Sequence, residues 1–275
     1  MPDQYQYSDN EPGRYVYWYA TAATTAITLD TGQLRFGTYA QMNDPRENQR
    51  WWPSFSVDDE AEDRPGRIEE ASDELDRVIR QGVRLKCFTI DAQDPFSVGG
   101  DGAWHNGWAR ARMWQQYADE HRGACLVLDR QALLDQVRVA ARRDRVLTGQ
   151  VAYADKRLHF HFALSDIRGD ALLPFARAER ERRADELYFL KNLDWASERE
   201  YRMVVLSDPT DKPLYVNFTT ALRGIVVGEA FPDAELSVLR TRLARIQHAD
   251  MPVARCIWFS GAPQVVPSDA QPPGI

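Results

Sequence analysis

The sequence is poor in lysine and lacks the short motifs that assign a chain to a common enzyme class. Only four of its 34 basic residues are lysine, and the rest are arginine. No Cys-x-x-Cys pair is present, so neither a zinc ribbon nor a dithiol redox centre is indicated. The absence of a Gly-x-Gly-x-x-Gly loop, a Gly-Lys-Ser/Thr loop and a Gly-x-Ser-x-Gly elbow argues against a Rossmann site, a P-loop and an α/β-hydrolase.

Long apolar runs and an excess of basic charge are also missing. No run approaches the ~20 apolar residues that span a bilayer, and residues 1–10 lack the pattern of a signal peptide. We therefore expect a cytoplasmic protein with no membrane partner. The net charge of −7 argues against non-specific nucleic-acid binding through a uniformly basic surface. Cys87, Cys125 and Cys256 lie far apart in apolar runs, which predicts buried, reduced thiols.

The pattern of apolar residues predicts a mixture of strands and helices. Short apolar or aromatic runs predict strands over residues 14–20, 84–90, 124–128, 146–153, 201–206, 222–227 and 253–259. Helical spacing predicts helices over residues 22–30, 68–79, 110–122, 130–142, 175–191 and 235–247. Because the elements alternate irregularly and several turns are too short for a parallel crossover, we expect an α+β fold with mixed or antiparallel sheets. The expected organisation is a single domain over residues 14–260, with flexible termini at residues 1–13 and 261–275.

The stretch Trp195-Ala-Ser-Glu-Arg-Glu-Tyr-Arg202 places two carboxylates, Glu198 and Glu200, at the mouth of a predicted buried strand. If the strand extends back far enough, the alternation of side chains puts both glutamates and Arg202 on one face. Charges in such a place are costly unless they are paired or used. Either the glutamates face solvent, with Glu200 bonded to Arg202, or they form a site. Such a site holds a ribose hydroxyl and stabilises the positive charge that develops when a glycosidic bond is cleaved.

Other candidate groups have weaker signals. No metal site is predicted at the glutamates, because no neighbouring His or Asp completes a ligand shell. His159 and His161 have ligand spacing on one strand face but no third ligand nearby, so a structural or surface role is favoured. The aromatic run over residues 15–19 either stacks on a planar ring or belongs to the core, as aromatic strands more often do.

Four separated blocks of the sequence together resemble a bacterial family of about this length that is classed as a domain of unknown function. Met113-Trp-Gln-Gln-Tyr-Ala-Asp-Glu-His-Arg-Gly123 and the stretch from Trp195 to Arg202 are the more specific blocks. The other two are Tyr17-Trp-Tyr19 with the segment 34–47, which ends in Asn-Asp-Pro-Arg-Glu, and Leu222-Arg-Gly-Ile-Val-Val-Gly228. The resemblance brings no established activity.

The layout is also similar, more loosely, to that of ADP-ribosyltransferases, with an aromatic first strand, a helix, Gly-x-Leu and a late Glu-x-Glu strand. Those enzymes bind NAD between two small sheets, so the resemblance implies split sheets with helices and NAD as substrate. It implies Glu200 as the catalytic carboxylate, Glu198 as its substrate-facing partner, and Tyr17 or Tyr19 at the nicotinamide ribose. The first-strand His and the Ser-Thr-Ser motif of that family are missing. The other residues expected at the nucleotide site are Asn43, Asp44, Trp114, Tyr117 and Arg202.

Three functional hypotheses follow from these patterns. The first is an ADP-ribosyltransferase-like enzyme, a toxin or defence effector, that modifies an acceptor macromolecule, either a protein or a nucleic acid. The alternative is a non-enzymatic module that binds a nucleotide, a nucleic acid or a protein in the same cleft, with the acidic residues 58–63 and the arginine-rich residues 177–183 as recognition surfaces. The third is a hydrolase that acts on a phosphate with a divalent ion.

Overall fold

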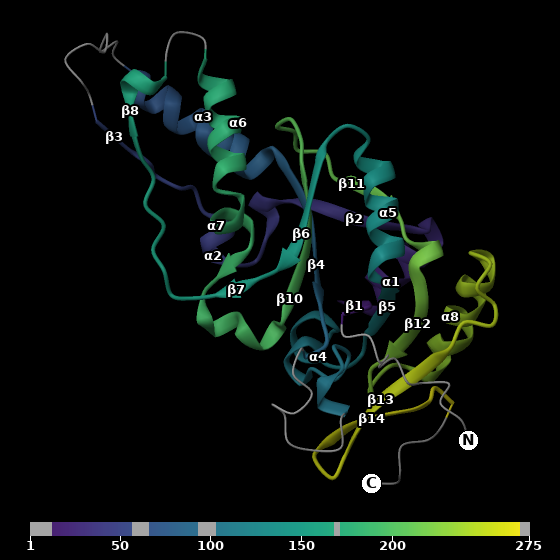
Figure 1. The fold of residues 1–275 in the computed structure, drawn as a ribbon. Coiled ribbons are helices and arrows are strands. Elements are labelled where there is room, and N and C mark those ends of the chain that lie inside the picture. Colours follow the sequence, from purple (N-terminus) through teal and green to yellow (C-terminus); the bar gives the residue numbers. More distant parts are fainter. Residues whose placement is uncertain (1–12, 57–65, 93–102, 168–170, 270–275) are drawn as a thin grey trace.

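The computed structural model describes residues 13–56, 66–92, 103–167 and 171–269 (Figure 1). The strands are β1 (Tyr15–Ala20), β2 (Gln33–Thr38), β3 (Ser54–Ser56), β4 (Val83–Thr89), β5 (Ala124–Asp129), β6 (Arg145–Gln150), β7 (Ala152–Tyr153), β8 (His161–Ala163), β9 (Leu190–Lys191), β10 (Glu200–Leu206), β11 (Leu214–Asn217), β12 (Leu222–Val227), β13 (Val253–Phe259) and β14 (Ala262–Pro267). The helices are α1 (Ala22–Thr31), α2 (Pro45–Asn48), α3 (Arg67–Gln81), α4 (Ala111–Tyr117), α5 (Arg130–Ala141), α6 (Leu172–Arg182), α7 (Ala184–Tyr188) and α8 (Asp233–Arg245).

The main sheet contains ten strands of the described residues. Its order is β11-β2-β4-β1-β5-β12-β13-β14, and β10 and β6 branch from β4. β10 pairs with β4 along its whole length, and β6 pairs with β10. The pairing of β12 with β13 is parallel and the other pairings in this sheet are antiparallel. The predicted α+β class with mixed and antiparallel sheets is therefore confirmed.

The sheet is split beside the middle of β4. On the edge of β4 that faces away from β10, β2 pairs with residues Arg84 and Leu85. On the same edge β1 pairs with β4 at one position, Tyr17 opposite Thr89. Between these contacts, residues 86–88 have no strand partner on this edge within the described ranges. The two strands therefore diverge and leave part of the edge of β4 open.

Local sequence explains where several elements begin and end. The Thr21 hydroxyl accepts a hydrogen bond from the backbone N–H of Thr24 at 3.1 Å and so caps α1. Gly32 ends α1 in the left-handed conformation, with a φ of 65°. The Asp129 carboxylate caps α5 by accepting from the N–H of Ala132 at 2.9 Å. Because the last residue of β5 is also the cap of α5, strand and helix follow each other without a loop.

Apolar clusters cover both faces of the sheet. On one face, α1, α5 and α8 pack over β1, β4, β5 and β10. On the other face, α3, α6 and α7 pack over β4 and β10, while α4 packs over β1 and β5 (Figure 1). This second face thus carries two separate clusters, and the split beside β4 lies at the boundary between them.

Three predicted elements are interrupted. The predicted helix over residues 175–191 is divided into α6 and α7 and then passes into β9, because Arg183 leaves the helical conformation with a φ of −105°. The predicted helix over residues 110–122 ends at Tyr117, since residues 119–121 all adopt positive φ. The predicted strand over residues 146–153 is broken at Val151, where β6 ends and β7 turns to pair with β9.

The C-terminal segment corrects the expectation of a flexible tail from residue 261. Strand β14 pairs with β13 from Ala262 opposite Phe259 to Pro267 opposite Ala254. Proline is tolerated here because β14 is the outer strand, where a missing N–H removes no ladder bond on the exposed side. Residues 1–12 and 270–275 lie outside the described residues, as do the acidic residues 58–63 and most of the glycine-rich stretch.

We expect Gly123→Ala to destabilise the fold by about 1–3 kcal/mol or more, because strong overpacking forces the backbone to shift. A Cβ at this position would lie 2.2 Å from the backbone oxygen of Ala20 and 2.9 Å from Ala118. Gly149→Ala is the matched control, since its Cβ would meet only the Phe189 ring at an ordinary 3.4 Å. Urea unfolding followed by tryptophan fluorescence measures both changes, and equal effects of the two substitutions would contradict the prediction.

Candidate functional site

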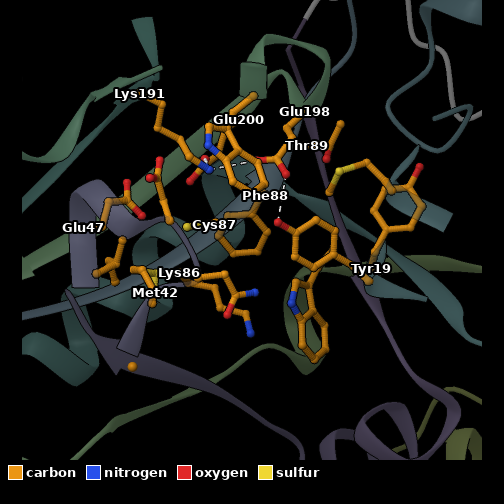
Figure 2. Close-up of a pocket in the computed structure, with 18 of the residues that line it drawn as sticks. Tyr19, Met42, Glu47, Lys86, Cys87, Phe88, Thr89, Lys191, Glu198 and Glu200 are labelled. Atoms are coloured by element: carbon orange, nitrogen blue, oxygen red, sulfur yellow. Dashed lines mark hydrogen bonds and ion pairs between the residues drawn. The ribbon is translucent and has the colours of Figure 1, made fainter. Parts of the chain in front are cut away.

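A cavity of about 220 Å³ opens at the split beside β4 (Figure 2). Consecutive residues of two strands line it, 17–19 of β1 and 85–89 of β4, so both strands present their edges to the hollow. Two residues of β2, residues 41–44 with Glu47, two residues of α4 and four residues between Lys191 and Glu200 complete the wall. The cavity therefore joins segments that are up to 183 positions apart in the sequence, from Tyr17 to Glu200.

Strand register aligns three polar residues across one side of the cavity. Tyr17 of β1 is opposite Thr89 of β4, and Thr89 is opposite Glu200 of β10. Directly opposed residues of neighbouring strands point to the same face of a sheet. Tyr17 and Glu200 therefore share a face with Thr89 between them, and Arg202, two residues along β10, shares it as well.

Lys191 joins the two glutamates of the Glu-x-Glu pair. Its Nζ lies 2.9 Å from Oε2 of Glu198 and 3.0 Å from Oε2 of Glu200. The three side chains are at most 6% exposed. The Tyr117 hydroxyl donates to Oε1 of Glu198 at 2.8 Å. The interpretation with solvent-facing glutamates is therefore wrong, because both carboxylates are buried and hydrogen-bonded.

Arg202 extends this network to a third carboxylate. Its guanidinium is fully buried and donates from Nε to Oε1 of Glu200 and from Nη2 to Oε1 of Glu47, both at 2.5 Å. Its Nη1 donates to the backbone oxygen of Tyr188 at 2.8 Å. Three carboxylates and two cations therefore form one continuous chain of ion pairs, Glu47–Arg202–Glu200–Lys191–Glu198.

The Asn-Asp-Pro-Arg-Glu motif explains how Glu47 reaches this chain. Asp44 caps the one-turn helix α2 by accepting from the N–H of Arg46 at 2.9 Å, and Pro45 occupies the first helical position. Proline at this position has a φ suited to the helix and restricts the preceding residue to an extended conformation. The turn therefore directs Glu47, which is 1% exposed, toward the sheet.

The two glutamates of the pair arrive by different routes. β10 begins at Glu200, so the strand does not extend back to Glu198 as the alternation argument required. Glu198 instead ends a 3-10 turn, Leu193–Glu198, and Arg199 follows in the left-handed conformation with a φ of 46°. The Tyr153 hydroxyl accepts from the backbone N–H of Glu200 at 2.8 Å. The left-handed conformation of Arg199 thus reverses the direction of the chain, so that the carboxylates of Glu198 and Glu200 both contact Lys191.

Burial and neighbouring charges act in opposite directions on the ionisable groups. Burial raises the pKa of Glu200, but the charges of Arg202 and Lys191 outweigh it and hold this pKa at about 2. Burial lowers the pKa of Lys191, but Glu200 and Glu198 outweigh it and raise this pKa above its usual value. For Glu47 burial prevails over Arg202, and its pKa is raised. Glu200 is therefore firmly ionised, and Glu47 takes up a proton before Glu200 does.

The other end of the cavity carries cations. The Nζ of Lys86 lies 3.8 Å from the centroid of the Trp18 ring and makes no hydrogen bond or ion pair with another described residue. Burial lowers the pKa of Lys86 to about 7, and the charge of Arg35 acts in the same direction. Arg35 also lines the cavity. Figure 2 shows Lys86 on the opposite side of the hollow from Lys191.

Two buried oxygens of the lining residues have no hydrogen-bond partner in the described part of the chain. They are Oγ1 of Thr89 and Oδ2 of Asp44. Buried polar atoms in folded proteins are normally paired. Both oxygens suit a ligand with hydroxyl or amide groups.

Seven of the nine residues predicted for the site line the cavity, namely Tyr17, Tyr19, Asn43, Asp44, Tyr117, Glu198 and Glu200. Trp114 and Arg202 do not, and their predicted contact with a nucleotide is corrected. Trp114 is fully buried and meets Tyr19 edge to face with ring centroids 5.0 Å apart, and Arg202 lies beneath Glu200. Both residues therefore position groups that line the cavity.

Among the lining residues that sequence reasoning missed, four carry ionisable groups next to the predicted ones, namely Glu47, Lys86, Cys87 and Lys191. A signal for two of them was present, since lysine is rare in this chain and both lysines follow apolar residues. Glu47 carries no comparable signal, because its partner Arg202 is 155 residues away. Its role depends on a long-range contact that only the folded chain makes.

The cysteines and histidines add no further chemistry to the cavity. All three cysteines are free, as predicted, although Cys87 is only half-buried and lines the cavity. Burial, followed by the charge of Glu200, raises the pKa of the Cys87 thiol well above its usual value, so it is not an activated nucleophile. His159 and His161 are exposed. The described residues contain no group of three or more His, Cys, Asp or Glu side chains arranged to hold a metal ion.

Fold and site together define an α+β protein with a split sheet and a buried chain of ion pairs beside its cavity. Residues 113–203 match the model of a family described as "Protein of unknown function (DUF2971)", which confirms the predicted similarity to a family without an assigned activity. The matched range runs from α4 to β10 and includes Tyr117, Lys191, Glu198, Glu200 and Arg202. No curated protein and no solved structure matches the chain.

No helix within the described ranges combines the length and the apolar character that crossing a membrane requires.

We expect Arg202→Met to lower the free energy of unfolding by about 3–5 kcal/mol, because it leaves the buried carboxylates of Glu47 and Glu200 without their shared cation. Arg145→Met is the control, since Arg145 is 59% exposed and pairs with Glu181, itself 43% exposed. Such a surface pair contributes at most about 1 kcal/mol. Urea unfolding at neutral pH measures both, and a similar small loss in the two variants would refute the role of Arg202.

The depressed pKa of Glu200 predicts a pH dependence of stability. In the unfolded chain this carboxyl takes up a proton near pH 4.5, but in the folded chain it does so only near pH 2. Its ionised form therefore stabilises the fold fully above pH 4.5, and this contribution is lost as the pH falls toward 2. The difference in unfolding free energy between the wild type and Glu200→Gln should be largest at neutral pH and shrink in acid. A difference that stays constant would contradict this.

Proposed function

We propose that the cavity binds a nucleotide with a cationic base, with NAD as the best candidate, and cleaves the bond between base and ribose. The observation that carries this proposal is the ionised carboxylate of Glu200, held by Arg202 and Lys191 beside an aromatic-lined hollow. The nicotinamide–ribose C–N bond breaks, and nicotinamide leaves as a neutral molecule with the bonding electron pair. An acceptor nucleophile then bonds to the anomeric carbon and loses its proton.

The arrangement of charge suits this reaction. Cleavage passes through an oxocarbenium-like state, which a fixed carboxylate stabilises as the positive charge develops. Because Arg202 and Lys191 hold Glu200 in place, little reorganisation is needed when that charge appears. Tyr17 lies on the same face as Glu200 with Thr89 between them, and the Thr89 hydroxyl has no hydrogen-bond partner among the described residues. This arrangement supports a ribose bound next to Glu200.

The opposite end of the cavity suits phosphate. The ammonium of Lys86 faces the hollow without an anionic partner among the described residues, and Arg35 lies nearby. The volume of about 220 Å³ is below the ~300–1,000 Å³ of typical ligand pockets. We infer that the base and its ribose occupy the cavity while the remainder of a dinucleotide extends past Lys86 into the opening.

A second candidate function is a non-enzymatic nucleotide-binding module. The specific observation in its favour is that each carboxylate oxygen of Glu198 and Glu200 already accepts a hydrogen bond from a protein donor. Donors that saturate these oxygens compete with a substrate hydroxyl for their lone pairs. In this case the ion pairs serve to shape the cavity, and the nucleotide remains intact.

We expect the wild-type protein to bind NAD in calorimetry and to release nicotinamide, detected by liquid chromatography. Glu198→Gln should bind NAD but release nicotinamide at least about 100-fold more slowly than the wild type, since the substitution removes charge at the reacting centre. Lys86→Met should instead weaken binding, with its folding preserved because Lys86 forms no ion pair with any residue that the structure describes. Arg145→Met, remote from the cavity, is the control for both measurements.

The outcomes separate the two candidates. Binding of NAD without nicotinamide release favours the binding module. Absence of binding at millimolar NAD by a folded protein, verified by circular dichroism, rejects NAD as the ligand for either candidate. Undiminished nicotinamide release by both Glu198→Gln and Glu200→Gln would refute the proposed role of the carboxylates.

A further inference from the structure

A second hollow lies on the outer side of the wall that α2 forms along the cavity. Its volume is about 460 Å³, and its lining residues include four cations and no carboxylate. This is the reverse of the whole chain, whose net charge is −7. The residues that give the hollow its character, termed here the basic–aromatic groove, are Arg46, Arg50, Trp51, Trp52, Lys156 and Arg157.

The groove and the cavity share a thin partition. On α2, Glu47 faces the cavity whereas Arg46 lines the groove, and on the segment after β9, Lys191 faces the cavity whereas Asn192 lines the groove. The Nη1 of Arg46 donates to the backbone oxygen of Lys156 at 2.9 Å and lies 3.3 Å from Oδ1 of Asn192. In each of these two short segments, adjacent residues therefore line different hollows, one the cavity and the other the groove.

Three aromatic side chains line the groove, and one of them, Trp52, is exposed. Trp52 is 75% exposed, and the Arg50 guanidinium lies over its ring at 4.2 Å from the centroid. Trp51 lies against Phe160 with ring centroids 5.1 Å apart, and both line the groove. An indole this exposed is costly to keep in water, and such surfaces mark interaction sites.

We propose that the basic–aromatic groove binds single-stranded nucleic acid. Strands of RNA or DNA are held by cations that follow the phosphates and by aromatic rings on which bases stack. The groove provides both at one place, with Trp52 as the stacking platform and Arg157 as a cation without an ion pair to another described residue. This assignment rests on the groove alone and does not require the proposed NAD chemistry.

The number of cations available to phosphates sets the expected salt dependence. Arg50 pairs with Asp73 at 2.5 Å and Lys156 pairs with Glu186 at 2.9 Å, so two of the four cations already have carboxylate partners. Two to four phosphate contacts on a single strand give a slope of log K against log salt of roughly −1.4 to −2.8. We therefore expect a modest salt dependence, as for a small basic groove on an otherwise acidic protein.

Fluorescence anisotropy with labelled single strands of ~12 nucleotides, one RNA and one DNA of mixed sequence, tests the inference on the full chain. We expect binding of at least one strand that weakens between ~50 and ~200 mM salt. Trp52→Ala should weaken it roughly 5- to 100-fold through lost stacking, and Arg157→Glu should weaken it and reduce the salt slope. Both residues are exposed, so both variants retain the fold.

Matched controls keep the test specific. Tyr215→Ala removes another exposed aromatic ring, 52% exposed on β11, and Arg245→Glu reverses another exposed charge, 71% exposed on α8. Both controls should bind like the wild type. Failure of both strands to bind at low salt, or equal binding by the groove variants and the controls, would overturn the proposal. Glu198→Gln should bind normally, so failure of the NAD chemistry alone leaves the groove assignment intact, and the reverse also holds.

Discussion

The buried guanidinium of Arg202 is the constraint on which the rest of the structure depends. A charge removed from water in this way is tolerated only when its hydrogen-bonding groups are satisfied by close partners. Here one partner, Glu200, lies on the same strand β10, and the other two are Glu47 of α2 and the carbonyl of Tyr188 in α7. These segments cannot separate without exposing an unpaired charge to an apolar surrounding, so the ion pairs specify how α2 and α7 meet the sheet.

The same network explains why the cavity stands open. One face of the sheet carries two apolar clusters, and the charged residues lie at the boundary between them, next to the part of β4 where β1 and β2 diverge. The charged groups are themselves buried, and they need ion-pair partners that neither apolar cluster can supply. The cavity therefore forms where apolar packing stops, and its anionic end is rigid because Lys191 and Arg202 anchor Glu198 and Glu200. Rigid, desolvated charge of this kind is what electrostatic catalysis requires.

The two hollows on either side of α2 give the protein an anionic interior site and a basic exterior one. A single helical turn separates them, since Glu47 faces inward while Arg46 faces outward. Adjacent residues of this turn, Arg46 and Glu47, therefore belong to two hollows of opposite charge.

Sequence by itself determined the class of the fold, most of its strands and helices, and seven residues of the cavity. The fold rested on local signals, namely apolar periodicity and helix termini, whereas the cavity residues rested on the Glu-x-Glu pair before a buried strand and on resemblance to known families. Only the tertiary structure decided that Glu47, Lys86 and Lys191 belong to the site, that Arg202 supports it from behind, and that the end of the chain forms an outer strand. The energy of a buried ion pair depends on which groups from distant parts of the chain come into contact. Local sequence patterns do not specify those contacts.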